Sequence, residues 1–143
     1  MDYRERYARL FALVVGAVLI AAGVIGFFYE SAFTSDETRR DAVFGILDVN
    51  GWHNAVHIVT GLVALALART HAREFALGFG VVYLVVAVWG FIVGDGDSIL
   101  SIVPVNTEDN VLHAILAVAG FAVYALTAAE RPHAVPPVRP TPA

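Results

Sequence analysis

Residues 49–68 read VNGWHNAVHIVTGLVALALA, a polar start followed by a long apolar run that contains no charged residue. Asn50 is typical of a helix N-cap, because its side-chain oxygen can accept hydrogen bonds from the free N–H groups of the first turn. The residues after His57 are almost all apolar, as in a helix surrounded by other apolar groups. This stretch therefore predicts a helix with a polar beginning and an apolar body.

Much of the chain consists of an internal sequence repeat. VNGWHNAVH at 49–57 recurs fifty-six positions later as VNTEDNVLH at 105–113, which aligns Asn54 with Asn110 and His57 with His113. Asn106 aligns with Asn50 and is likewise predicted to cap its helix. The preceding helices are also similar: 10 of 21 positions are identical between ARLFALVVGAVLIAAGVIGFF at 8–28 and AREFALGFGVVYLVVAVWGFI at 72–92. We therefore predict two related units of two helices each, at about residues 8–69 and 72–129.

Four uncharged runs are long enough to cross a lipid bilayer. They contain 18 to 20 residues each, at 10–29, 51–68, 75–94 and 110–129, and a helix needs about 20 residues to cross the hydrocarbon core. Only 15% of the residues are charged and the mean hydropathy is +0.70, whereas soluble domains have about 25% charged residues. The predicted fold is an all-α, integral membrane four-helix bundle in a single domain, residues 1–130, followed by a disordered cytoplasmic tail at 131–143.

The orientation follows from the arginines. Since each unit has two helices, both units enter the membrane from the same side and are parallel, related by a pseudo-two-fold axis along the membrane normal. Seven of the nine basic residues lie in the N-terminal segment, the middle connection and the tail, which places both termini in the cytoplasm. The two outer connections end alike, in ILDVN at 46–50 and IVPVN at 102–106, and each is expected to lie as a short segment in the membrane interface.

Several functional classes are excluded or disfavoured. The absence of cysteine excludes thiolate metal sites and iron–sulfur clusters held by the protein. The net charge of −4 and the lack of a basic cluster with interleaved aromatics argue against nucleic acid. With no nucleophile–base pattern and no phosphate-binding glycine loop, we predict that the chain is not an enzyme. The expected partners are the lipid bilayer and other membrane proteins or a second copy of the chain.

Polar residues gather on one side of the second and fourth helices. At about 100° per residue they fall within an arc of roughly 100°. An unpartnered polar group in hydrocarbon costs several kcal/mol, so this arc must face protein. His57 and His113 face each other if the second and fourth helices line the axis, and each is buried in its own unit if the first and third do. We call this set the polar stripe: Asn50, His53, Asn54, His57, Asn106, Asp109, Asn110 and His113.

The polar stripe has three interpretations. The first, which the sequence favours, is that it fixes helix packing in a small non-enzymatic accessory or scaffold protein that needs no cofactor. The second is a ligand set: a zinc-like ion held by His53, His57, Asp109 and His113, or a haem with His57 and His113 as axial ligands. The third is a path for a small solute or protons, because ionisable residues within membranes are commonly functional.

The paired motifs also resemble a known family. VNGWHNAVHIVTG followed by VPVNTEDNVLHAILAVAG, together with the matching first and third helices, is similar to a bacterial family of small four-span membrane proteins, the domain of unknown function DUF4383. The resemblance covers about residues 9–129, and His53-Asn54 and Asp109-Asn110 match the family's two motifs. It implies a multi-pass protein of the bacterial plasma membrane, and it implies no activity.

Overall fold

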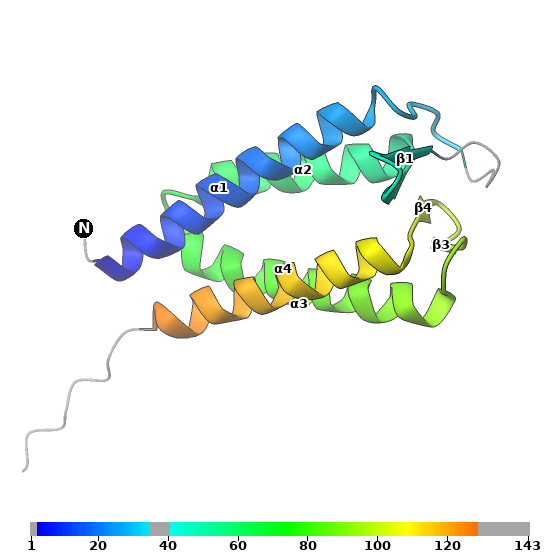
Figure 1. Ribbon diagram of the computed structural model, residues 1–143. Coiled ribbons are helices and arrows are strands. Elements are labelled where there is room, and N and C mark those ends of the chain that lie inside the picture. Colours follow the sequence, from blue (N-terminus) through cyan, green and yellow to red (C-terminus); the bar gives the residue numbers. More distant parts are fainter. Residues whose placement is uncertain (1–2, 35–40, 129–143) are drawn as a thin grey trace, which may run out of the picture.

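The computed structural model of this chain describes residues 3–34 and 41–128. Within them, four helices run in antiparallel pairs along one axis (Figure 1). The helices are α1 (Tyr3–Gly26), α2 (Gly51–Leu67), α3 (Ala72–Val93) and α4 (Thr107–Leu126). Short hairpins join the helices of each pair: β1 (Asp41–Val43) with β2 (Leu47–Val49), and β3 (Ser98–Ile99) with β4 (Val103–Pro104). The tail predicted at 131–143 lies outside the described residues.

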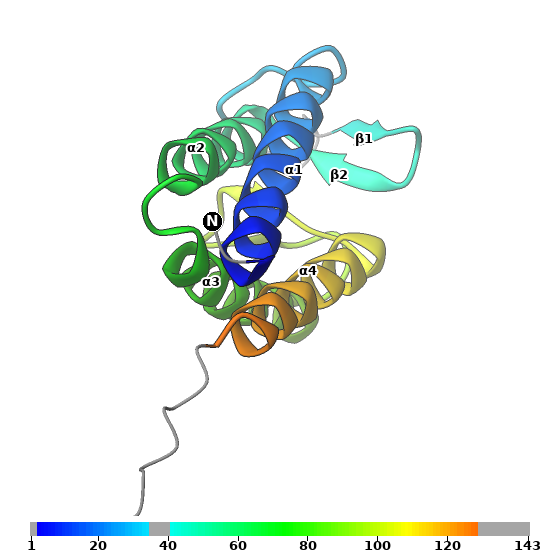
Figure 2. The same cartoon turned by 90° about the vertical axis from the view of Figure 1, so that its left-hand side faces the viewer.

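Each helix packs most closely on its neighbour in the chain, α1 on α2 and α3 on α4 (Figure 2). Small residues allow these close contacts. A Cβ added to Gly61 would lie 2.7 Å from the carbonyl oxygen of Gly16, and one added to Gly120 would lie 2.7 Å from that of Ala76. Close approach through small residues is the usual way in which helices associate in membranes, where lipid offers apolar side chains no advantage in burial.

The two pairs are joined by an aromatic core near the N-terminal end of α1. The Phe11 ring of α1 packs edge-on against the Phe79 ring of α3, with 5.7 Å between ring centroids. Phe79 in turn stacks on Tyr83 at 4.1 Å. These aromatic rings and Phe75 pack in one buried cluster with Ala12 and other small and apolar residues of all four helices. The contact between the pairs at this end is therefore made mainly by α1 and α3.

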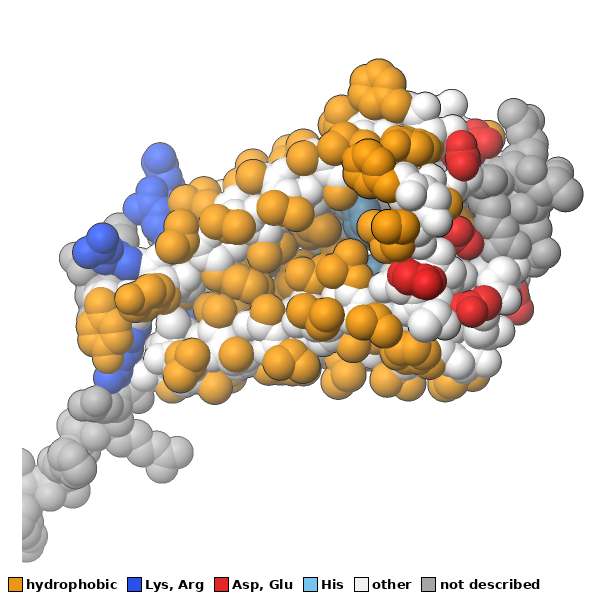
Figure 3. Space-filling view, viewed as in Figure 1, with side chains coloured by type: hydrophobic (Ala, Val, Ile, Leu, Met, Phe, Trp, Pro, Cys, Tyr) orange, Lys and Arg blue, Asp and Glu red, His pale blue; other side chains and the backbone are white. Residues whose placement is uncertain are grey.

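The surface is that of a membrane protein. Three helices, α1, α3 and α4, are long and apolar enough to cross a membrane, while α2 is apolar but has only 17 residues. Large apolar side chains cover the middle of the molecule, arginines gather at one end and acidic side chains at the other (Figure 3). The fold is mostly helical, as predicted, but the all-α prediction lacked the two hairpins.

The two segments expected in the membrane interface form parts of hairpins. ILDVN and IVPVN supply the second strands, β2 and β4, which pair back onto β1 and β3. The chain reverses between the strands through residues with positive φ, among them Phe44 at 56° and Leu100 at 54°. Each hairpin leads directly into an asparagine that caps the next helix, as predicted. Asn50 Oδ1 accepts from His53 N, and Asn106 Oδ1 accepts from Asp109 N, both at 2.9 Å.

The side-chain nitrogens of the same two asparagines connect the two helix pairs. Asn50 Nδ2 donates to the carbonyl oxygen of Ile102 in the second hairpin, and Asn106 Nδ2 donates to that of Ile46 in the first, both at 2.7 Å. Ile46 and Ile102 hold matching positions in ILDVN and IVPVN. The two contacts are therefore reciprocal: each asparagine caps its own helix and fastens the opposite hairpin.

We predict that Asn106→Ala lowers stability by about 2 kcal/mol, because it removes both the cap, worth ~1 kcal/mol, and the amide donor, worth ~1 kcal/mol. Asn106→Ser should lose about half as much, since serine keeps a capping oxygen but lacks the nitrogen that reaches Ile46. Thermal unfolding in detergent measures both variants. An unfolding temperature of the serine variant equal to that of the unmodified protein would contradict the contribution assigned to the link between the hairpins.

Candidate metal centre

The asparagines in the middle of the polar stripe are used for helix packing. Asn54 Nδ2 donates to the carbonyl oxygen of Glu30 at 2.9 Å. Its Oδ1 lies against Gly26 of α1, where an added Cβ would overlap it, and Asn110 Oδ1 lies in the same way against Gly90 of α3. Both asparagines are buried. The glycines opposite them leave the space that the amides occupy, so both asparagines pack between helices. Neither Oδ1 has a hydrogen-bond partner among the described residues, so this packing rests on contact more than on hydrogen bonds.

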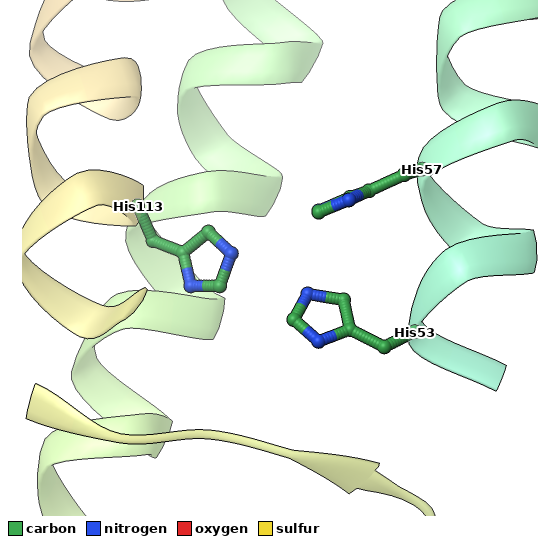
Figure 4. Close-up of side chains that lie close together, drawn as sticks. All are labelled: His53, His57 and His113. Carbon is green, nitrogen blue, oxygen red and sulfur yellow. The ribbon is translucent and has the colours of Figure 1, made fainter. Parts of the chain in front are cut away.

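The three histidines of the polar stripe converge between the two helix pairs. His53 and His57 extend from α2 toward His113 on α4 (Figure 4). One ring nitrogen from each lies within 4.8 Å of the other two. The ring centroids of His53 and His57 are 4.5 Å apart, and those of His53 and His113 are 6.2 Å apart. His53 and His113 are buried and His57 is half-buried. The fold thus gathers three nitrogen donors from helices of different pairs.

The ring of His53 is oriented for binding through its outer nitrogen. Its Nδ1 lies 2.8 Å from the carbonyl oxygen of Asp48. A carbonyl oxygen can only accept, so Nδ1 carries the proton and donates, which leaves a lone pair on Nε2. Metal-binding histidines usually have their second nitrogen held in this way by a carbonyl or carboxylate, which sets the tautomer and the direction of the ring.

His113 has an unsatisfied polar atom. Its Nδ1 is buried and has no hydrogen-bond partner among the described residues, and its ring packs edge-on against Tyr83 with 5.4 Å between centroids. A buried polar atom without a partner costs about 1–3 kcal/mol. Independently of this atom, the ring can offer a nitrogen to a group bound between the histidines, and three imidazole nitrogens form a donor set that fits a metal ion or another ligand with affinity for imidazole.

Asp109, the fourth predicted ligand, lies beside the histidines. Its Oδ2 accepts from the backbone N–H of Asp48 at 3.0 Å, and its own N–H donates to the Asn106 cap. The carboxylate therefore holds the first hairpin against the start of α4. Within the described residues it is not among the nitrogen and oxygen atoms that converge, so the structure brings together three of the four predicted ligands.

A cavity of about 540 Å³ leads to the histidines. It opens between α1 and α4, where Figure 3 shows histidine side chains at the back of an opening in the apolar surface. Asp109, His53, His57 and His113 line its inner part. Its walls and roof are apolar and come from α1, α4 and the first hairpin, with residues such as Val18, Leu19, Leu112, Leu116 and Phe44. The site is therefore open toward the apolar surface of the molecule.

The comparisons with known proteins give a family but no activity. The model of a family described as a domain of unknown function, DUF4383, matches residues 9–126. The chain belongs to the DUF4383 family. Neither the comparison with curated proteins nor the comparison with solved structures found a match. The matched residues of this DUF4383 protein include all three histidines and Asp109, but the role of these residues has to be argued from their geometry.

Two neighbours of the site were not expected from the sequence: Tyr83, whose ring contacts His113, and Asp48, whose backbone contacts both His53 and Asp109. The role of Asp48 could have been inferred from a difference between the two repeated motifs. The motifs ILDVN and IVPVN differ in this DUF4383 chain by having Asp48 where the copy has Pro104. Proline has no N–H and could not donate to a carboxylate. The one polar difference between the matching motifs thus marks the hairpin that supports the site.

Proposed function

We propose that this DUF4383 protein is a non-enzymatic accessory protein of the bacterial plasma membrane that binds one divalent transition-metal ion, such as Zn²⁺, through His53, His57 and His113. The observation that carries this proposal is the convergence of three imidazoles, with one nitrogen of each within 4.8 Å of the others. Neutral imidazole is a good ligand for zinc, copper and nickel. The partners of this accessory protein would be other membrane proteins or a second copy of the chain.

The distances require only a modest closure of the site. Tetrahedral zinc with bonds of about 2.0–2.1 Å needs ligand nitrogens about 3.3 Å apart. The nitrogens lie within 4.8 Å of one another, and the remaining gap would close by rotation of side chains, for which the half-buried His57 has the most room. Three protein ligands leave a fourth position, and it would face the cavity that Asp109 also lines.

The proposed topology has four spans, with α2 as the short one, and two parallel units. The reciprocal hydrogen bonds of Asn50 with Ile102 and of Asn106 with Ile46 support the two-unit arrangement, because they join matching positions. The arginine-rich end, with both termini, would be cytoplasmic. The histidines lie within the first two turns of α2 and α4, so the metal would lie roughly 3–9 Å along the helices from their outer ends.

The other interpretations of the histidines fit the geometry less well. A haem between His57 and His113 would extend sideways from its iron, and the ring of His53, only 4.5 Å from that of His57, occupies part of that space. A path for protons or a small solute would have to continue toward the arginine-rich end. There the described core cluster consists of Phe75, Phe79, Tyr83 and apolar residues, so it offers one hydroxyl and no chain of polar groups.

Metal analysis of the purified protein tests the proposal. We expect about one equivalent of zinc to remain per chain after dialysis, no Soret band, and loss of the zinc in His57→Ala. His57 is the histidine to replace first because it is half-buried, so its loss disturbs packing least. If the His57→Ala variant keeps as much zinc as the unmodified protein, or if neither binds any, the metal proposal is wrong. A Soret band that disappears in the variant would establish haem in its place.

A further inference from the structure

The end of the molecule opposite the histidines contains a basic pocket of about 420 Å³. It is formed by the start of α1, the turn between α2 and α3, and the start of α3. Figure 3 shows arginine side chains gathered at this end. Two glutamates also line the pocket, so its formal charge is +2. The charged residues that line it are Arg4, Arg9, Arg69, Arg73, Glu5 and Glu74.

Arg73 is held in place with an unsatisfied donor. Its guanidinium lies over the ring of Tyr124, 3.8 Å from the centroid, and its Nε is buried without a hydrogen-bond partner among the described residues. Stacking on an aromatic face orients a guanidinium but leaves its in-plane N–H groups for other acceptors. Arg9 occupies the matching position in α1. The pocket is therefore lined by two corresponding arginines, Arg9 from the first helix pair and Arg73 from the second.

The start of α3 adds a second source of positive potential. His71 precedes the helix and its side chain makes no capping hydrogen bond, in contrast to Asn50 before α2 and Asn106 before α4. The first N–H groups of α3 therefore donate no hydrogen bond to the side chain of their cap residue. Ala72 and Arg73 of this first turn line the pocket. Free N–H groups at a helix start, aligned with the positive end of the helix dipole, bind anionic oxygens.

We infer that this pocket binds the phosphate of an anionic phospholipid such as phosphatidylglycerol. Arginine matches phosphate oxygens in both charge and geometry, and basic pockets between helix ends are known sites for anionic headgroups. Exposed apolar side chains continue from this end along α1, among them Val14 and Val18, where acyl chains can lie. The headgroup would contact α1 and α3 together and so stabilise the junction of the two pairs. This inference does not depend on the metal site.

The test compares lipids and two matched arginine variants in detergent. Thermal unfolding and native mass spectrometry would be measured with added phosphatidylglycerol, with phosphatidylcholine and with inorganic phosphate. Arg69→Ala removes an exposed arginine that lines the pocket, and Arg6→Ala removes an exposed arginine of the same end that does not line it. We expect phosphatidylglycerol alone to raise the unfolding temperature, about fivefold weaker lipid binding in Arg69→Ala, and unchanged binding in Arg6→Ala.

Three results would overturn the inference. Equal effects of phosphatidylglycerol and phosphatidylcholine would show that the charge of the headgroup is not recognised. Equal weakening in the two arginine variants would show diffuse attraction to the basic end instead of binding in the pocket. An equal shift with inorganic phosphate would show that the bound species is a soluble anion. As a further variant, Arg73→Lys keeps the charge but loses the planar fork, and weaker lipid binding by a folded Arg73→Lys protein would support a role of that geometry.

Discussion

Replacing Gly90 with alanine is expected to destabilise the protein by about 3 kcal/mol. The new Cβ would overlap the side-chain amide of Asn110, whose Oδ1, Cγ and Nδ2 are the atoms nearest to it. Asn110 is 1% exposed, so its side chain has no free space into which it can turn. Overpacking costs about 1–3 kcal/mol, and the upper end of this range applies because the new atom overlaps a side chain that is itself buried. The unfolding temperature in detergent is the measurement.

Two further variants isolate the cause. Gly78 lies in the same helix, and an added Cβ there would meet nothing within 4 Å. Gly78→Ala should therefore leave stability unchanged or raise it by up to ~1 kcal/mol, the difference in helix propensity. In an Asn110→Ala background, Gly90→Ala should cost much less, because all three overlapping atoms are gone. Equal destabilisation by Gly90→Ala in both backgrounds would contradict the contact between Gly90 and Asn110.

Replacing His113 with alanine is expected to weaken metal binding by more than about 100-fold, because a ligand is lost. Even replacing a residue that only hydrogen-bonds to a ligand lowers metal affinity by about 10–100-fold. His113 is the only member of the cluster that comes from α4, so without it the two imidazoles of α2 remain. Metal that binds only the folded state raises the unfolding temperature by mass action. This rise should be seen in the unmodified protein and be lost in His113→Ala. Titration calorimetry with zinc and thermal unfolding measure the two effects.

His71→Ala is the matched control for this prediction. His71 is exposed, precedes α3 and lies outside the group of converging histidines, so its replacement should change neither the zinc affinity nor the metal-dependent rise. The metal-free His113→Ala protein should still be less stable than the unmodified one, since the ring packs on Tyr83. If His113→Ala binds zinc as tightly as His71→Ala does, then His113 only packs the helices and the proposed centre is wrong.

The helices and their caps could be predicted because the signals for them are local. Each uncharged run of 18 to 20 residues contains the apolar length that a helix needs in a bilayer. Asn50 and Asn106 act on N–H groups three residues away, a distance set by helix geometry alone. The alignment of the two halves also places Asn54 opposite Asn110, and Gly26 opposite Gly90, at corresponding positions.

The hairpins were missed because their strands are only two or three residues long. So short a strand has no periodicity to recognise, and its apolar residues look like a continuation of the helix or of an interfacial segment. For the same reason Asp48 was not placed near His53 and Asp109. The backbone pairing of β1 and β2 brings the Asp48 carbonyl and N–H to these side chains.

The candidate site was predictable from the sequence only in part. The polar arc on α2 and α4 follows from helical spacing, so the need of these residues for protein neighbours was evident from the sequence. Which neighbours they have depends on packing between the pairs. The pairs meet through Phe11 and Phe79 near one end, and reciprocal hydrogen bonds join the hairpins at the other. These distant contacts set the separation of α2 from α4, so only the tertiary structure could bring His113 to His53 and His57 and leave Asp109 beside them.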